Sequence, residues 1–140
     1  MKIVDANVLI YAVNTAQRQH EPAHRWLLAA LNGAEPIVLP WISLLAFVRV
    51  ATNPRAFARP LMVADALAAV ERWLNSPAAV LVEPSHRHFQ VLSQLLTDVG
   101  TAGNLTTDAH LAALAHEHRA EVVSFDRDFE RFDVTVVVPV

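Results

Sequence analysis

The chain has 140 residues, of which 54% are hydrophobic and 18% are charged, with a net charge of −3 and no cysteine. This length and composition predict one globular domain, residues 1–140, built on a single substantial core. They exclude disulfides, a cysteine-type zinc site and a general polyanion binder, so any contact with nucleic acid has to be local. No apolar run reaches the roughly 18 residues of a membrane span, and no signal-peptide pattern opens the chain, so a cytoplasmic location fits.

The first elements in chain order are a short apolar strand over residues 2–5, which ends on Asp5, and an apolar helix over residues 6–13. Glu21-Pro22 predicts the start of a second helix, which stops near Asn32-Gly33. The remaining elements are predicted from proline breaks and apolar periodicity. They are strands over residues 36–40, 79–82, 121–125 and 134–138, and helices over residues 42–52, 63–74, 85–99 (with Ser85 as N-cap) and 106–118.

Short apolar strands that alternate with helices predict an α/β fold with a parallel, or mostly parallel, sheet covered on both faces. In such sheets the functional site lies beyond the carboxyl ends of the strands. Functional polar side chains are therefore expected directly after predicted strands and at the start of the helices that follow them.

Asp108 lies on the apolar face of its predicted helix, almost in line with Ala112 and Ala115, whereas His110 and Glu117 fall on the opposite side. A carboxylate on a buried helix face is costly unless something compensates it. The free N–H groups of the first helical turn favour negative charge there, and a bound cation would do the same. A capping role explains the position of Asp108 along the helix but not the face it occupies.

Two more acids end predicted strands, Asp5 after the first and Asp126 after the strand over residues 121–125. Both are expected at the edge where the Asp108 helix begins, and three carboxylates at one edge repel one another unless a cation holds them. Oxygen-only ligands suit Mg²⁺ or Mn²⁺, which act on phosphates. The alternatives are an N-cap role for Asp5 and, for Asp126, an acidic turn with Asp128. The three acids together favour metal-assisted phosphodiester or phosphoryl chemistry.

Other polar residues carry weaker signals. The histidines of the helices are expected at the surface, and the tryptophans in the core. An aspartyl-phosphate phosphotransferase with Asp5 as nucleophile lacks its partner groups, because position 7 is Asn and the single lysine is Lys2. Three glycines form no phosphate-binding turn, which argues against dinucleotide binding. Three arginines flank a loop that could contact RNA phosphates, although solvated arginines are the default; they are Arg49, Arg55 and Arg59.

Three segments together resemble a known family. Residues 3–11 (IVDANVLIY) resemble the opening motif of PIN-domain ribonucleases, specifically VapC toxins, and residues 104–115 and 123–129 resemble the later acidic motifs of that family. The resemblance spans essentially the whole chain, with the motifs in order and in register. It implies a three-layer α/β/α fold with a central parallel sheet, Mg²⁺-dependent endoribonuclease activity, a cognate VapB-type antitoxin and a homodimer. It also implies that Asp5 and Asp108 ligate Mg²⁺, with Asp126 completing the site.

The chain departs from the family pattern in the third predicted helix. The family usually places a glutamate three residues before an arginine, and here Ala46 stands three residues before Arg49. No acid occurs between Glu35 and Asp65. We expect a reduced metal affinity, with a water or Asp128 as a substitute ligand. Activity is expected to persist because the three other acids remain; the alternative is a degenerate domain that binds RNA or an antitoxin without cleavage.

Overall fold

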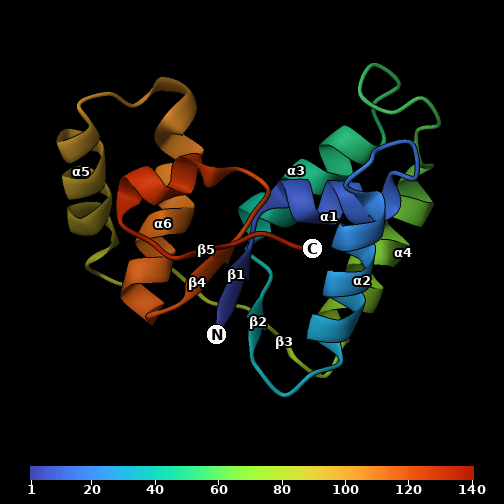
Figure 1. Ribbon diagram of the computed structural model, residues 1–140, viewed down its shortest axis with the longest axis horizontal. Helices are drawn as coiled ribbons and strands as arrows, with labels where there is room; N and C mark the ends of the chain where they lie inside the picture. The colour runs from blue at the N-terminus through green and yellow to red at the C-terminus, as the bar shows by residue number, and fades with distance from the viewer.

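The computed structural model describes residues 1–140 and contains one five-stranded sheet (Figure 1). Its strand order is β3-β2-β1-β4-β5, and every neighbouring pair is parallel. The strands are short, and they are β1 (Lys2–Val4), β2 (Ile37–Val38), β3 (Ala79–Val80), β4 (Glu121–Val123) and β5 (Val136–Val137). The predicted α/β class is confirmed, and the sheet is parallel throughout.

Helices cover both faces of this sheet. The α-helices are α1 (Ala6–Val13), α2 (His20–Leu31), α3 (Trp41–Ala51), α4 (Val63–Leu74), α5 (His88–Val99) and α6 (Thr106–His118), and η1 (Gly103–Leu105) and η2 (Arg127–Phe132) are short 3₁₀ helices. The first four α-helices lie on one side of the sheet, and α5, α6 and η2 lie on the other (Figure 1). The three-layer α/β/α arrangement is therefore confirmed. No helix is both long and apolar enough to cross a membrane.

The hydrophobic core is split into two clusters, one on each face of the sheet. One contains Phe47, whose ring meets the Trp73 ring edge to face with centroids 4.7 Å apart. The other contains Phe129 of η2, packed with the buried residues of α6. The prediction that tryptophans are core residues is wrong for Trp41, whose exposed fraction is 50%. This side chain lies on the first turn of α3, where one side of the helix faces solvent.

Several element boundaries differ from the sequence prediction. The strands are shorter than predicted, and α2 begins at His20, so that Pro22 occupies the first turn, where its missing N–H costs no hydrogen bond. The prediction that Ser85 caps α5 is wrong, because α5 begins at His88. The hydroxyl and the backbone N–H of Ser85 both donate to the carboxylate of Glu117 on α6. Its Oγ also accepts the backbone N–H of Arg87 at 3.1 Å, so the same hydroxyl serves a local turn and a tertiary contact.

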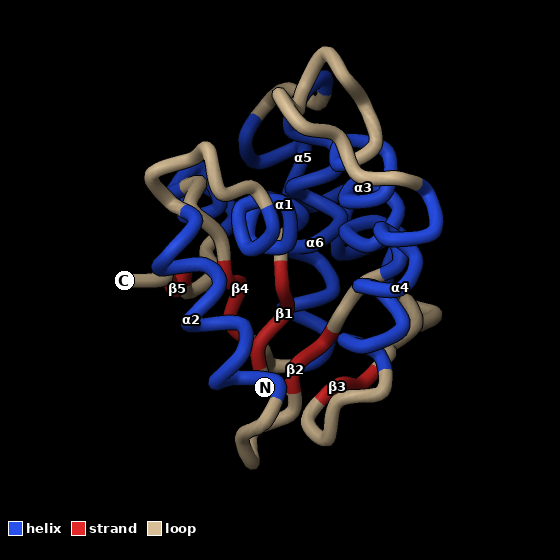
Figure 2. The backbone as a smooth tube through the Cα atoms, turned by 90° about the vertical axis from the view of Figure 1, so that its right-hand side faces the viewer, coloured by secondary structure: helices blue, strands red, loops and turns tan.

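The arrangement of β1 and β4 positions the candidate site. These strands are central neighbours, with Lys2 opposite Glu121 and Val4 opposite Val123, so their carboxyl ends coincide. Helix α1 begins directly beyond the end of β1, and α6 lies alongside (Figure 2). Residues that follow β1 and β4 are therefore brought to one edge of the sheet.

Candidate active site

Asp5 follows β1 directly and forms the N-cap of α1. One carboxylate oxygen accepts the backbone N–H of Ala6 at 2.7 Å, and the other accepts the hydroxyl of Ser124 at 2.7 Å. The capping role considered for Asp5 is correct, but it uses only one of the two oxygens. Burial raises the pKa of the Asp5 carboxyl, the two hydrogen bonds oppose that rise, and the negative charge of Asp126 adds to it.

Ser124 and Asn7 are the functional residues that sequence reasoning did not single out. Ser124 is fully buried directly after β4, and besides donating to Asp5 its Oγ accepts the Asn7 side-chain amide and the Asp126 backbone N–H, each at 2.9 Å. The side-chain oxygen of Asn7 accepts the backbone N–H of Phe125 at 3.2 Å. These bonds join the start of α1 to the end of β4. The sequence feature that could have indicated Ser124 is a hydroxyl near the end of a predicted apolar strand, two positions before the acid Asp126.

Asp108 lies in the first turn of α6, where the N-cap residue is Leu105 and no side chain caps the helix. Partial burial raises the pKa of Asp108 to about 6, with further contributions from the negative charges of Asp5, Asp126 and Asp128. Because these charges contribute to the shift, Asp108 lies within electrostatic range of the other acids. The fold thus brings the α6 acid toward the two strand-end acids, while their role as metal ligands stays a prediction.

Asp126 is the N-cap of η2, and its carboxylate accepts the backbone N–H of Asp128 at 2.8 Å. Both side chains are exposed. The alternative of a local acidic turn is thus correct for the hydrogen bonding of Asp126. The same carboxylate nevertheless raises the pKa of two acids, Asp5 and Asp108, so its charge belongs to the cluster as well.

The carboxylates form an all-oxygen donor set, which fits a hard divalent cation better than any other metal class. No group of three His, Asp or Glu side chains is arranged in metal-ligating geometry in the structure. The donor chemistry still fits, because the repulsion that raises the pKa of Asp108 is what a bound cation would relieve. Asp5 and Asp108 are the candidate residues to hold such an ion.

A cavity of about 330 Å³ opens beside Asp5, between α1, α3 and α6. Ala46 and Arg49 both line it, so the helix position that lacks a carboxylate borders the same cavity as Asp5. The two other arginines predicted to contact RNA, Arg55 and Arg59, are exposed in the segment after α3 and do not line this cavity.

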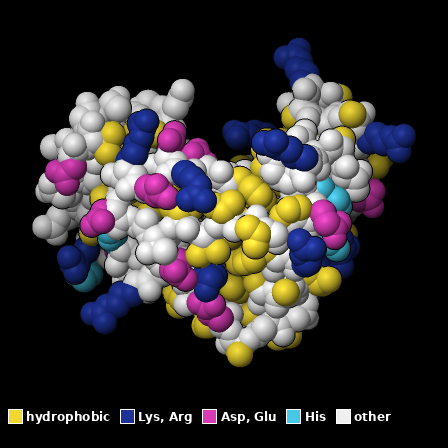
Figure 3. Space-filling model, viewed as in Figure 1, with side chains coloured by type: hydrophobic (Ala, Val, Ile, Leu, Met, Phe, Trp, Pro, Cys, Tyr) yellow, Lys and Arg dark blue, Asp and Glu magenta, His cyan; other side chains and the backbone are white.

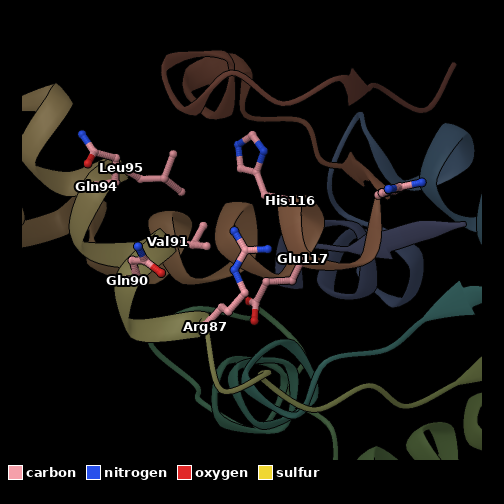
Figure 4. Close-up of a pocket in the computed structure, with 8 residues that line it drawn as sticks. Arg87, Gln90, Val91, Gln94, Leu95, His116 and Glu117 are labelled. Carbon is pink, nitrogen blue, oxygen red and sulfur yellow. The ribbon is translucent and has the colours of Figure 1, made fainter.

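A larger cavity, about 560 Å³, lies elsewhere, between α5 and the carboxyl end of α6, and Arg87, His116 and Glu117 line it (Figure 4). None of the predicted site residues lines this cavity. The Glu117 carboxylate also forms a hydrogen bond with His88 Nδ1 at 2.5 Å, and His88 Nε2 lies 2.9 Å from His110 Nδ1. The prediction that the helical histidines are surface residues is therefore wrong for His88, whose side chain is 13% exposed. These contacts pack α5 against α6.

Comparison with known proteins identifies the family. Residues 2–134 match the family model described as the PIN domain. The chain is 56% identical over 133 residues to ribonuclease VapC37 of Mycobacterium tuberculosis, a match that covers 95% of this chain and 92% of that protein. It is 45% identical over 132 residues to ribonuclease VapC33 of the same organism, which covers 94% of this chain and 92% of that protein.

Solved structures agree on the fold. The crystal structure of M. tuberculosis VapC20, a toxin that cleaves the sarcin–ricin loop, superposes with a TM-score of 0.74 at 17% identity over 99% of this chain and 100% of that chain. VapBC2 from Rickettsia felis, bound to a promoter DNA fragment, gives a TM-score of 0.70 at 14% identity over 99% of this chain and 98% of that chain. The family match and the two close relatives lead to one conclusion: the chain belongs to the PIN domain family, within its VapC branch.

Proposed function

We propose that the chain is an Mg²⁺-dependent endoribonuclease that acts as the toxin of a VapBC-type toxin–antitoxin module. The observation that carries this proposal is the placement of Asp5, Asp108 and Asp126 around the carboxyl edge of β1 and β4. Besides burial, the charge of Asp126 raises the pKa of Asp5, and the charges of Asp5 and Asp126 raise the pKa of Asp108. The relatives at 56% and 45% identity that are named ribonucleases support the same activity.

The chain's own residues have distinct tasks in this reaction. Asp5 and Asp108 hold the ion and Asp126 completes the site, while Ser124 fixes the orientation of the Asp5 carboxylate through a 2.7 Å hydrogen bond. Asn7 holds Ser124 in turn, through its side-chain amide. Bound Mg²⁺ supplies an activated water and stabilises charge on the phosphate. No protein nucleophile is required, because water attacks the phosphodiester in line.

The partners we infer are a VapB-type antitoxin and a second copy of the chain. Structural neighbours were solved as toxin–antitoxin complexes, among them one from Klebsiella pneumoniae. Hydrophobic side chains gather on the part of the surface that carries α1 and α2 (Figure 3). Large exposed apolar side chains also occur on α2, α3 and α4, and they include Leu28, Trp41, Leu45 and Leu67. Exposed apolar surface of this extent is typical of proteins that bind partners.

The decisive experiment is an RNA cleavage assay with Mg²⁺ and with EDTA, run beside the Asp5→Asn variant. We expect cleavage by the parent protein only when Mg²⁺ is present, and none by Asp5→Asn. Cleavage by Asp5→Asn at the parent rate would show that the acid cluster is not the catalytic centre.

A second candidate function is a PIN domain that binds RNA or an antitoxin without cleaving RNA. The observation in its favour is the neutral Ala46 in the cavity beside Asp5, together with the lack of three residues in metal-ligating geometry. The same assay separates the two candidates, because a non-cleaving domain would bind RNA and leave it intact with Mg²⁺ present.

A further inference from the structure

The cavity beside Asp5 has two chemically different walls. Asp5 provides a carboxylate on one side, and α3 provides Ser43, Ala46 and Arg49 on the other. These three α3 residues recur at intervals of three, so they lie on one side of the helix. The remaining lining residues are mostly apolar, which makes each polar group in the cavity conspicuous.

Ser43 is the first notable group of the α3 wall. Its exposed fraction is 1%, and its hydroxyl has no hydrogen-bond partner although its backbone N–H donates to the Pro40 carbonyl at 2.9 Å. Buried hydroxyls are almost always paired, and serines in helices commonly bond to a carbonyl of the preceding turn. The Ser43 hydroxyl does neither: its oxygen is shielded from solvent in this rotamer, and Ser43 is one of the residues that line the cavity. A ligand that accepts a hydrogen bond would satisfy it.

Arg49 is the second group. It lies in the last turn of α3, exposed to solvent, and it takes part in none of the ion pairs of the protein. Helix α3 carries no acid to neutralise it, since Ala46 occupies the intervening position. The α3 wall therefore combines a hydroxyl donor with an unpaired guanidinium, which is a donor set for an anionic oxygen rather than for a cation.

We propose that the α3 wall is a phosphate subsite, in which the Ser43 hydroxyl, once rotated about its Cα–Cβ bond toward the cavity, and the Arg49 guanidinium bind phosphate oxygens of the RNA backbone. The small side chain of Ala46 leaves room for the phosphate between them. This inference rests on the proposed function, because that function makes RNA the ligand beside Asp5. The RNA backbone would then be held from two sides. On the Asp5 side Mg²⁺ would mediate the contact, and on the α3 side Ser43 and Arg49 would contact the RNA without a metal ion.

The subsite predicts that part of the RNA affinity is independent of metal. Binding of a fluorescein-labelled single-stranded RNA is measured by anisotropy in EDTA, which prevents Mg²⁺-dependent cleavage, at several salt concentrations. We expect Ser43→Ala to weaken binding about tenfold, as for loss of one hydrogen bond to a charged group. Arg49→Gln should weaken binding and reduce the slope of log affinity against log salt by about 0.7, the single-strand value per phosphate contact.

Matched controls separate the subsite from general effects on charge or folding. Arg18→Gln removes an exposed arginine of the α1–α2 loop, and Ser93→Ala removes a hydroxyl on α5; neither residue lines the cavity. Both should bind RNA with the affinity of the parent. Ser43→Ala should keep or raise the melting temperature, because it removes an unpaired buried hydroxyl, so its weaker binding would not reflect unfolding.

Two sets of results would overturn the inference, and they differ in what they say about the proposed function. If the parent cleaves RNA with Mg²⁺ but either Ser43→Ala or Arg49→Gln binds like its control, the subsite is wrong and the nuclease assignment stands. If the parent neither binds nor cleaves RNA, the proposed function fails and the subsite fails with it.

Discussion

At the scale of single residues, the proposed chemistry depends on carboxylates held where their charges repel. Asp108 shows this most clearly, since its pKa is raised to about 6 by burial and by Asp5, Asp126 and Asp128. A side chain in such a position is unfavourable for the metal-free protein, so its value has to lie in function. Substitution at this position should therefore separate stability from activity.

The first prediction is that Asp108→Asn abolishes RNA cleavage and raises the melting temperature of the metal-free protein at neutral pH. The ionised carboxylate costs stability because its pKa is higher in the folded state than the ordinary 3.8, so the cost is absent below pH 3.8 and complete above pH of about 6. Melting curves of both proteins in EDTA across this range test the prediction. The gain should shrink as the pH falls, and normal cleavage by the variant would rule out a role as ligand.

The second prediction concerns Ala46, which lines the same cavity as Asp5. We predict that Ala46→Glu lowers the Mg²⁺ concentration for half-maximal cleavage, by about tenfold, since it adds a hard oxygen ligand. The variant should also melt at a lower temperature than the parent in EDTA, because it adds like charge to the cluster. Ala46→Gln is the matched neutral control. Identical Mg²⁺ curves for Ala46→Glu and Ala46→Gln would show that position 46 does not reach the ion.

At the scale of elements, the sequence predicts the helix boundaries better than the strand boundaries. It also predicts the acidic residues of the candidate site better than the Ser124 and Asn7 side chains that form hydrogen bonds around Asp5. Asp5 and Asp126 were predicted to meet because each follows a strand, and strand ends coincide in a parallel sheet. The contacts of Ser124 link residues 117 and 119 positions apart, and no local pattern reports them. Ser85 shows a further case: its hydroxyl accepts the nearby backbone N–H of Arg87, as its local sequence suggests, but it also donates to the distant Glu117, which no local pattern reports.

The junction between β4 and α1 yields the third prediction. Ser124→Ala should lower the free energy of unfolding by about 1–3 kcal/mol, the cost of leaving buried polar groups without a partner. These groups are the Asn7 amide, the Asp126 backbone N–H and one Asp5 oxygen. Because the lost hydrogen bond lowers the pKa of Asp5, that pKa should rise further and move the acidic limb of the pH–rate profile to higher pH. Ser93→Ala is the control, and an unchanged profile would contradict the positioning role.

At the scale of the whole molecule, the parallel sheet concentrates negative charge at one edge. The order β3-β2-β1-β4-β5 puts β1 and β4 at the centre, so two of the three acids follow neighbouring strands. The net charge of the chain is only −3, which means that the attraction for a cation comes from this arrangement and not from the overall composition. Folding and metal binding should therefore be coupled, because the unfolded chain has no such cluster.

The last prediction is that Mg²⁺ raises the melting temperature of the parent protein in a pH-dependent way. A ligand that binds only the folded state at about 100 times its dissociation constant stabilises that state by about 2.7 kcal/mol. As the pH falls through about 6, protons compete for Asp108, so the stabilisation by Mg²⁺ should decline. Thermal shift assays with Mg²⁺ and with EDTA at several pH values measure this, with Asp5→Asn as the control that should show little shift. A shift of equal size in Asp5→Asn, or one that grows as the pH falls, would mean that Mg²⁺ binds somewhere other than the acid cluster.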